Sequence, residues 1–103
     1  MTPAWPDGLR LVRTTPEFDE HTVPKGLLRE HRVAPEVWGR LLIRSGSLRF
    51  VFEDRSDAPS LLGEGDRQVI PPDVPHHVEL VGPVVFVVEF HRQIDDGVDT
   101  VTT

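Results

Sequence analysis

The sequence predicts an all-β domain, either a sandwich or a small barrel. Val, Leu, Ile and Phe recur in short runs separated by Gly, Pro, Asp and Ser, and no stretch longer than about ten residues has the 3.6-residue period of a helix. Seven such runs in 103 residues favour a sheet that closes on itself. We therefore expect a single domain over residues 1–103, with its core at about 9–92.

The candidate strands follow one another with few residues between them. In chain order they are Leu9–Arg13, Gly26–Arg32, Val37–Arg44, Ser47–Glu53, Arg67–Ile70, Pro75–Val81 and Val84–His91. The polar segment Ser56–Asp66 is expected to be a loop. Gln93–Thr103 contains no Lys or Arg and is expected to be a flexible tail.

The best-defined element is a hairpin closed by Ser45-Gly46, because glycine supplies the positive φ that a tight two-residue turn needs. Counting outward from this turn places apolar residues on one face, which we expect to face the core. The pairs on that face are Ile43/Leu48, Leu41/Phe50 and Gly39/Phe52.

Charge and composition narrow the class of ligand. The formal net charge is −6, and three aspartates of the tail account for half of it. No basic stripe is present, which argues against nucleic acid or an anionic membrane as a partner and favours a small molecule or an ion. Without cysteine, a metal ion would need histidine, carboxylate, carbonyl or water ligands. The N-terminus has no signal-peptide pattern and no run reaches transmembrane length, so we expect a cytoplasmic protein.

His76 is the first residue after a stiff proline-rich turn, Pro71-Pro72-Asp73-Val74-Pro75. Strand alternation places His76 on the same face as Val78, and His77 on the opposite, more polar face. His76 is therefore expected to point inward. Two interpretations remain open for it: a metal ligand held rigidly by the turn, or a core histidine bonded to a backbone carbonyl.

Glu89 is the one charged residue in an apolar run, Val84–Phe90. Alternation places it with Val85, Val87 and His91, and one interpretation is that it lies in the barrel interior with a metal as its partner. The competing interpretation is an ion pair with Arg29, Arg40 or Arg49.

The other histidines give weaker signals. His31 has the same odd parity as Gly39 and Leu41, although a single histidine is more typical of the surface. His21 lies in a polar loop and His91 ends a strand, and both are expected to be solvated.

Several of these segments occur in a characteristic joint order. They are Gly26-Leu27-Leu28, His31, Trp38-Gly39-Arg40, Gly46-Ser47-Leu48-Arg49-Phe50, Pro71-Pro72-Asp73-Val74-Pro75-His76 and Val88-Glu89-Phe90. Together they resemble the small cupin-like domain at the N-terminus of some TehB tellurite-resistance proteins, which also occurs as a stand-alone protein of the YeaR type. The resemblance implies a cupin-type double-stranded β-helix, a jelly-roll barrel that is often dimeric, with a metal site inside.

The broader cupin pattern implies which residues form that site. His76 matches the histidine of its second motif and His31 a histidine of its first, whereas Gly39 stands where the pattern has a glutamate. Glu89 is expected to supply the carboxylate instead. Such a donor set suits zinc first, and also iron, nickel or manganese. Trp38, Gly39, Phe50, Val78 and Val87 are expected to line the pocket.

The leading hypothesis is a cytoplasmic, homodimeric metal-binding cupin that handles or senses a small ligand or oxyanion. The first alternative is a metal-dependent enzyme, such as an oxygenase, isomerase or hydrolase, that uses an open coordination position. The second alternative is a metal-free structural or interaction domain. Methyl transfer is not expected, because TehB proteins owe it to a separate methyltransferase domain that this chain is too short to contain.

Overall fold

The protein is an antiparallel β-barrel in a computed structural model that describes residues 5–29, 31–53 and 58–93. Within this part, one sheet has the order β1-β6-β3-β4, with β2 added to β6 and β5 to β3. The strands are β1 (Leu9–Thr14), β2 (Phe18–Asp19), β3 (Val37–Phe52), β4 (Ser60–Gly63), β5 (Arg67–Ile70) and β6 (His76–Gln93), and one 3-10 helix, η1, spans Lys25–Leu28. The all-β prediction is confirmed. The expected tail beyond Gln93 lies outside the described residues.

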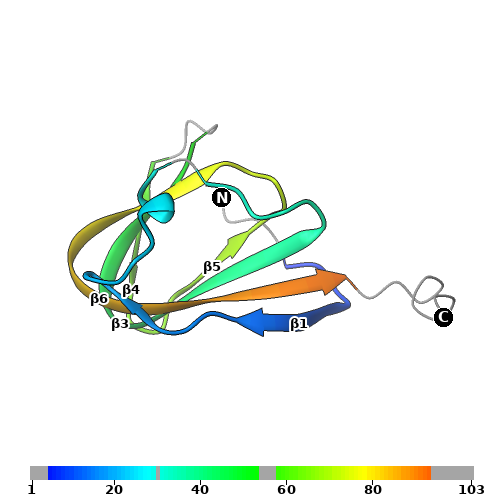
Figure 1. The fold of residues 1–103 in the computed structure, drawn as a ribbon, viewed down its shortest axis with the longest axis horizontal. Coiled ribbons are helices and arrows are strands. Elements are labelled where there is room, and N and C mark those ends of the chain that lie inside the picture. Colours follow the sequence, from blue (N-terminus) through cyan, green and yellow to red (C-terminus); the bar gives the residue numbers. More distant parts are fainter. Residues whose placement is uncertain (1–4, 30, 54–57, 94–103) are drawn as a thin grey trace, which may run out of the picture.

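Two long bent strands, β3 and β6, form the framework of the barrel. They pair along their whole lengths, from Val37 opposite Arg92 to Phe52 opposite His76. Both curve strongly at the left of Figure 1, so that their ends lie on opposite sides of the molecule's interior. The short strands extend this framework on both sides, because β5 and β4 pair with the two halves of β3, and β1 and β2 pair with β6.

The predicted hairpin at Ser45-Gly46 is wrong, because β3 continues through these residues. The pairing with β6 shifts between Ile43 and Ser45 and again between Gly46 and Leu48, so the site is a bulged bend. Gly46 has a φ of +74°, and a Cβ there would lie 2.0 Å from the carbonyl oxygen of Pro83. Glycine is required here because the backbones of β3 and β6 approach too closely for a side chain.

The predicted core face of β3 is nevertheless correct. Leu41 and Ile43 before the bend and Leu48 and Phe50 after it are all buried. A hairpin and a bulge both change the parity of the positions that face inward, so the same residues reach the core in either arrangement.

Three other segment predictions require correction. The strand expected over Gly26–Arg32 is replaced by η1 and a single bridge between His31 and His76. The expected loop Ser56–Asp66 contains β4. Finally, the two strands expected on either side of Gly82 form the single bent strand β6.

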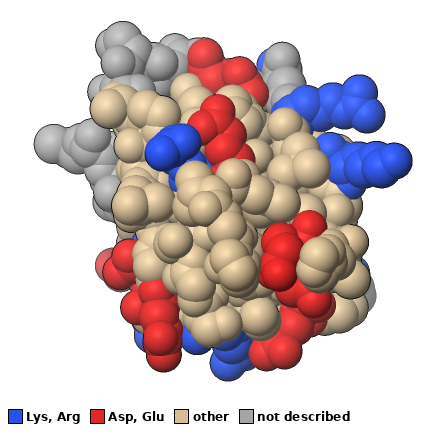
Figure 2. Space-filling model, turned by 90° about the vertical axis from the view of Figure 1, so that its left-hand side faces the viewer, with Lys and Arg blue, Asp and Glu red and all other residues tan. Residues whose placement is uncertain are grey.

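The buried core lies inside the curved sheet, where Phe50, Phe86, Leu41 and Leu48 are almost completely enclosed. Figure 2 shows the end of the barrel where β3 and β6 curve; its surface is largely neutral, with both acidic and basic side chains around it. Within the described residues, no helix is long or apolar enough to cross a membrane.

Candidate functional site

A cavity of about 210 Å³ opens into the barrel beside the core. Most of its lining is apolar and comes from β3, β5, β6 and the segment that contains η1. The lining residues are Arg13, Thr15, Phe18, Pro24, Gly26, Leu27, His31, Val33, Leu41, Phe50, Ile70, His76, Val78, Val88 and Phe90. An apolar space with a few convergent polar groups is typical of a small-molecule site.

His76 is the most deeply buried polar side chain of this wall, with 2% of its surface exposed. It points inward, as strand alternation predicts. Its Nδ1 lies 3.0 Å from the carbonyl oxygen of Val74, and its ring stacks on Phe50 with 5.3 Å between ring centres. A carbonyl oxygen only accepts hydrogen bonds, so Nδ1 carries the proton and the lone pair of the neutral ring is on Nε2. Burial lowers the pKa of His76, outweighing the opposing effect of the Val74 bond, and this keeps the imidazole neutral.

His31 lies beside His76 although 45 residues separate them in the sequence. Their backbones exchange two hydrogen bonds of 2.8 Å, and their rings meet edge to face with centres 5.4 Å apart. His31 is exposed and lines the cavity at its mouth. The fold thus brings together two of the three predicted metal ligands.

Glu89 lies away from the two histidines, which corrects the predicted three-residue ligand set. Phe90 and Val88, its neighbours in β6, face the cavity, so Glu89 lies on the outer face. There its Oε1 accepts hydrogen bonds from Arg40 at 3.0 Å and from His91 at 3.0 Å. The contacts of Glu89 therefore match the competing interpretation, an ion pair with an arginine, and the partner is Arg40. Burial alone would raise the pKa of Glu89, but the bonds from His91 and Arg40 together lower it.

Trp38 and His91 also lie on the outer face, in a cluster with Glu89, Arg40 and Trp5 that we call the outer cluster. Trp5 contacts the Trp38 ring at 6.4 Å and the His91 ring at 4.7 Å between ring centres. His91 is buried under this contact, with 7% exposed, so the expectation that it is solvated is wrong. Trp38 belongs to this outer cluster and is not a lining residue of the barrel cavity.

The other predicted pocket residues divide in the same way. Phe50 and Val78 line the cavity, whereas Gly39 and Val87 are not among its lining residues. A Cβ on Gly39 would lie 3.2 Å from the Cβ of Ile70, so the side chain of Ile70 occupies the space beside this glycine. Val87 is buried but has the outward parity of Glu89.

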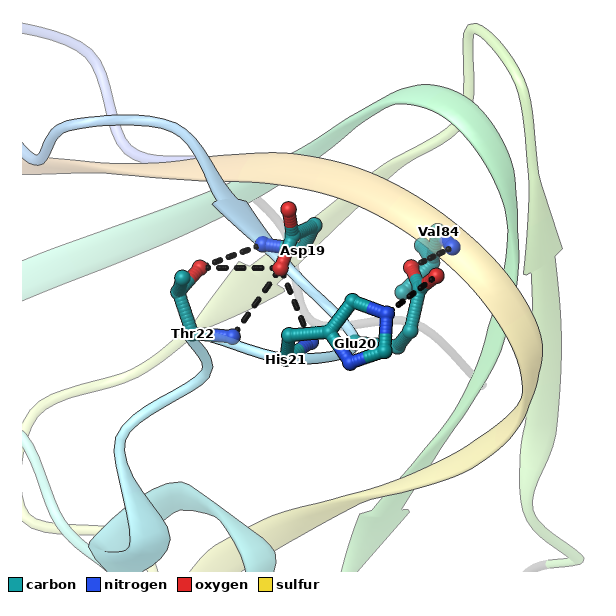
Figure 3. Close-up of polar contacts among 5 residues, drawn as sticks. All are labelled: Asp19, Glu20, His21, Thr22 and Val84. Carbon is teal, nitrogen blue, oxygen red and sulfur yellow. Dashed lines mark hydrogen bonds and ion pairs between the residues drawn. The ribbon is translucent and has the colours of Figure 1, made fainter.

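The segment between β2 and η1 reaches the cavity at Pro24, and two carboxylates fix its conformation (Figure 3). Oδ1 of Asp19 accepts hydrogen bonds from the backbone N–H groups of His21 and Thr22 at 2.8 and 2.9 Å. Oε1 of Glu20 accepts one from the N–H of Val84 in β6, at 3.0 Å. The His21 and Val84 bonds are the main reasons that the pKa values of Asp19 and Glu20 lie below their ordinary values. The side chain of His21 is exposed, as expected.

Sequence reasoning did not identify Arg13 as a cavity residue. The pairing of β1 with β6 shifts between Leu11 and Arg13, so that Arg13 lies opposite Phe90. Its guanidinium carbon is 5.1 Å from the centre of the Phe90 ring. A bulge changes which face a residue occupies, and the sequence of this strand contains no glycine that would indicate one.

Comparison with known proteins gives a consistent result. A family model described as the TehB-like domain matches residues 13–88. A protein from Escherichia coli K12 is similar over 91% of this chain and 100% of its own, with 22% identity and a TM-score of 0.82. TehB from Haemophilus influenzae is similar over 94% of this chain but only 36% of its own, with 19% identity and a TM-score of 0.76.

More distant structures share the architecture. An RmlC-like cupin from Desulfovibrio desulfuricans covers 80% of this chain and 78% of its own, with 19% identity and a TM-score of 0.53. No curated protein matches the sequence. At these identities the solved structures show the fold, which is that of a cupin.

Proposed function

The chain belongs to the family of TehB-like domains, and we propose that it is a cupin that binds a small ligand at a divalent metal ion held by His31 and His76. The observation that carries this proposal is the contact between the two imidazoles at the wall of the barrel cavity. The metal we propose first is zinc, which imidazole nitrogen binds well.

The spacing of the rings supports a shared ion. Zinc–nitrogen bonds of about 2.0–2.1 Å put each ring centre roughly 3.2 Å from the metal, and a tetrahedral angle then separates two ring centres by roughly 5.2 Å. The two ring centres are 5.4 Å apart. The spacing of the two ring centres is therefore compatible with one shared ion.

The hydrogen bonding and pKa of His76 also suit a residue that coordinates a metal. Its Nδ1–H is held by the carbonyl of Val74, which fixes the ring and leaves Nε2 as the donor atom. A metal binds only the neutral ring, and the lowered pKa of His76 favours that form.

Among the described residues, this place offers two histidines as protein ligands. In the part of the chain that the structure describes, no three His, Cys, Asp or Glu side chains form a group suited to a metal. We therefore expect an affinity below that of zinc sites with three protein ligands. A bound cation would supply a Lewis acid with positions left for water and for a ligand in the cavity.

Zinc titration of untagged, chelator-treated protein by calorimetry tests the proposal. We expect one Zn²⁺ per chain, with at least tenfold weaker binding in His31→Ala and His76→Gln. Two histidines outside the cavity provide matched controls, and His21→Ala and His77→Gln should bind zinc as the wild type does. Undiminished binding by His31→Ala, or loss only in His77→Gln, would contradict the proposal.

The second candidate is a domain that binds its ligand without a metal. It is favoured by the contacts of His76 with Val74 and Phe50, which would also satisfy a purely structural histidine. Less than about 0.1 zinc per chain after reconstitution would support this candidate over the first.

A further inference from the structure

A second hollow, of about 300 Å³, adjoins the barrel cavity. It is lined by Val12, Arg13, His31, Arg32, Val33, Ala34, Val37, Phe90 and Arg92. Four of these residues, Arg13, His31, Val33 and Phe90, also line the barrel cavity. The two hollows therefore meet at the mouth of the barrel, and we call the second one the arginine groove.

The arginine groove concentrates positive charge in an acidic protein. Three of its residues are arginines, although the chain has a net charge of −6. They come from three separate segments: Arg13 from β1, Arg32 from the segment before β3, and Arg92 from the end of β6. Like charges brought together by a fold repel one another unless an anion compensates them.

Protein carboxylates compensate this charge only in part. Arg32 contacts Asp73, with Nη1 3.5 Å from Oδ1 and 3.3 Å from the carbonyl oxygen. Arg13 lies over the Phe90 ring. Among residues 5–29, 31–53 and 58–93, no carboxylate forms an ion pair with Arg13 or Arg92. Within the described residues, the guanidinium groups of Arg13 and Arg92 thus lack a carboxylate partner and are placed to bind an anionic group from outside.

The arginine groove is more polar than the barrel cavity, and this contrast constrains the ligand. The barrel cavity beyond His31 is lined by Phe50, Val78, Val88 and similar residues. Its volume of about 210 Å³ exceeds the roughly 150 Å³ of an apolar cavity that admits benzene. A molecule that filled both hollows would have an apolar body of about that size and an anionic end.

We propose that the ligand is a small carboxylic acid whose carboxylate binds between Arg13 and Arg92 in the arginine groove, while its apolar body enters the barrel past His31. The planar fork of a guanidinium matches the two oxygens of a carboxylate. This inference rests on the proposed function in that it takes the barrel cavity to be a ligand site. It adds the chemical class of the ligand and assigns the recognition of its charge to the arginines.

Binding of a probe set tests this inference. Hexanoate and benzoate are titrated into zinc-loaded and zinc-free protein, beside the neutral molecules 1-hexanol and benzyl alcohol and beside inorganic phosphate. Affinities come from calorimetry, and NMR shifts of the Val78 and Val88 methyl groups report entry into the barrel. We expect each acid to bind at least tenfold more tightly than its alcohol, and to weaken as salt is raised.

Variants separate the groove from the metal site. The double substitution Arg13→Gln/Arg92→Gln should weaken the acids at least tenfold, weaken the alcohols far less, and not weaken zinc binding. Arg67→Gln is the matched control, because Arg67 is an exposed strand arginine that lines neither hollow. It should bind every probe as the wild type does.

Each failure has a distinct signature. Equal affinities for acid and alcohol, or unchanged acid binding in the double variant, would overturn the inference while leaving zinc binding intact. Phosphate binding as tight as that of the acids, without shifts at Val78 and Val88, would overturn the coupling of groove to barrel. Arginine-dependent acid binding in a protein that takes up no zinc would contradict the metal proposal and support this inference.

Discussion

Replacing Gly46 with alanine tests the bend at which β3 and β6 cross. Its φ is +74°, and the added Cβ would lie 2.0 Å from the carbonyl oxygen of Pro83 and 2.8 Å from Cα of Val84. The left-handed conformation costs a residue with a side chain about 1–2 kcal/mol. Moving two packed backbones apart adds about 1–3 kcal/mol. We expect a total loss of about 2–5 kcal/mol, which is a large part of the stability of a domain this small.

Gly65 provides a matched control for the steric part of this loss. Its φ is +86°, but no heavy atom lies within 4 Å of the position its Cβ would take. Gly65→Ala should therefore lose only the conformational part, about 1–2 kcal/mol. The remaining difference of about 2 kcal/mol corresponds to roughly 1.5–2 M in the midpoint of urea unfolding, for a slope of about 1.2 kcal/mol per M.

Urea unfolding followed by far-UV circular dichroism measures both variants under the same conditions. A Gly46→Ala protein that is already unfolded without urea, beside a folded Gly65→Ala protein, would agree with the steric account. Equal midpoints for the two variants would refute it, since an exposed hairpin turn at Gly46 would impose the conformational cost alone.

Two further predictions concern charged contacts outside the cavity. Burial by itself lowers the pKa of His77, but its bonds with Glu79 and Glu53 outweigh burial and raise it. The protonated ring therefore stabilises the folded protein fully at low pH, and this contribution is lost as pH rises through the raised pKa. Wild-type protein should accordingly lose more unfolding free energy than His77→Gln between about pH 6 and about pH 9, and parallel pH profiles would contradict this. Glu89→Gln should destabilise the fold by about 1–2 kcal/mol, because Arg40 loses a partly buried counter-charge. The same variant should bind zinc normally, and a tenfold loss of zinc affinity would show that Glu89 reaches the metal after all.

The fold class was predictable because the strand signals are local. Short apolar runs, a proline-rich turn and glycine punctuation are read from neighbouring residues. The pairing of the strands was not predictable, since Ser45-Gly46 fits both a hairpin turn and a bulge. What decides between them is the approach of Pro83 to Gly46, a contact between residues far apart in the sequence.

The candidate site was also predictable only in part. The inward direction of His76 follows from alternation after a fixed turn. Glu89 could not be placed, because Val84–Phe90 is apolar on both faces: one face lines the barrel, and the other faces outward beside Trp5 and Arg40. Alternation shows which residues share a face, but it indicates the buried side only where one face is polar.

Zinc-edge anomalous diffraction from crystals of the zinc-loaded protein tests the proposed site most directly. The account predicts one peak at the cavity wall, at bonding distance, about 2.0–2.1 Å, from Nε2 of His76 and from a ring nitrogen of His31. The competing outcome is a peak beside His77, although both of its ring nitrogens already contact the carboxylates of Glu53 and Glu79. A peak beside His77, with none between His31 and His76, would contradict the account.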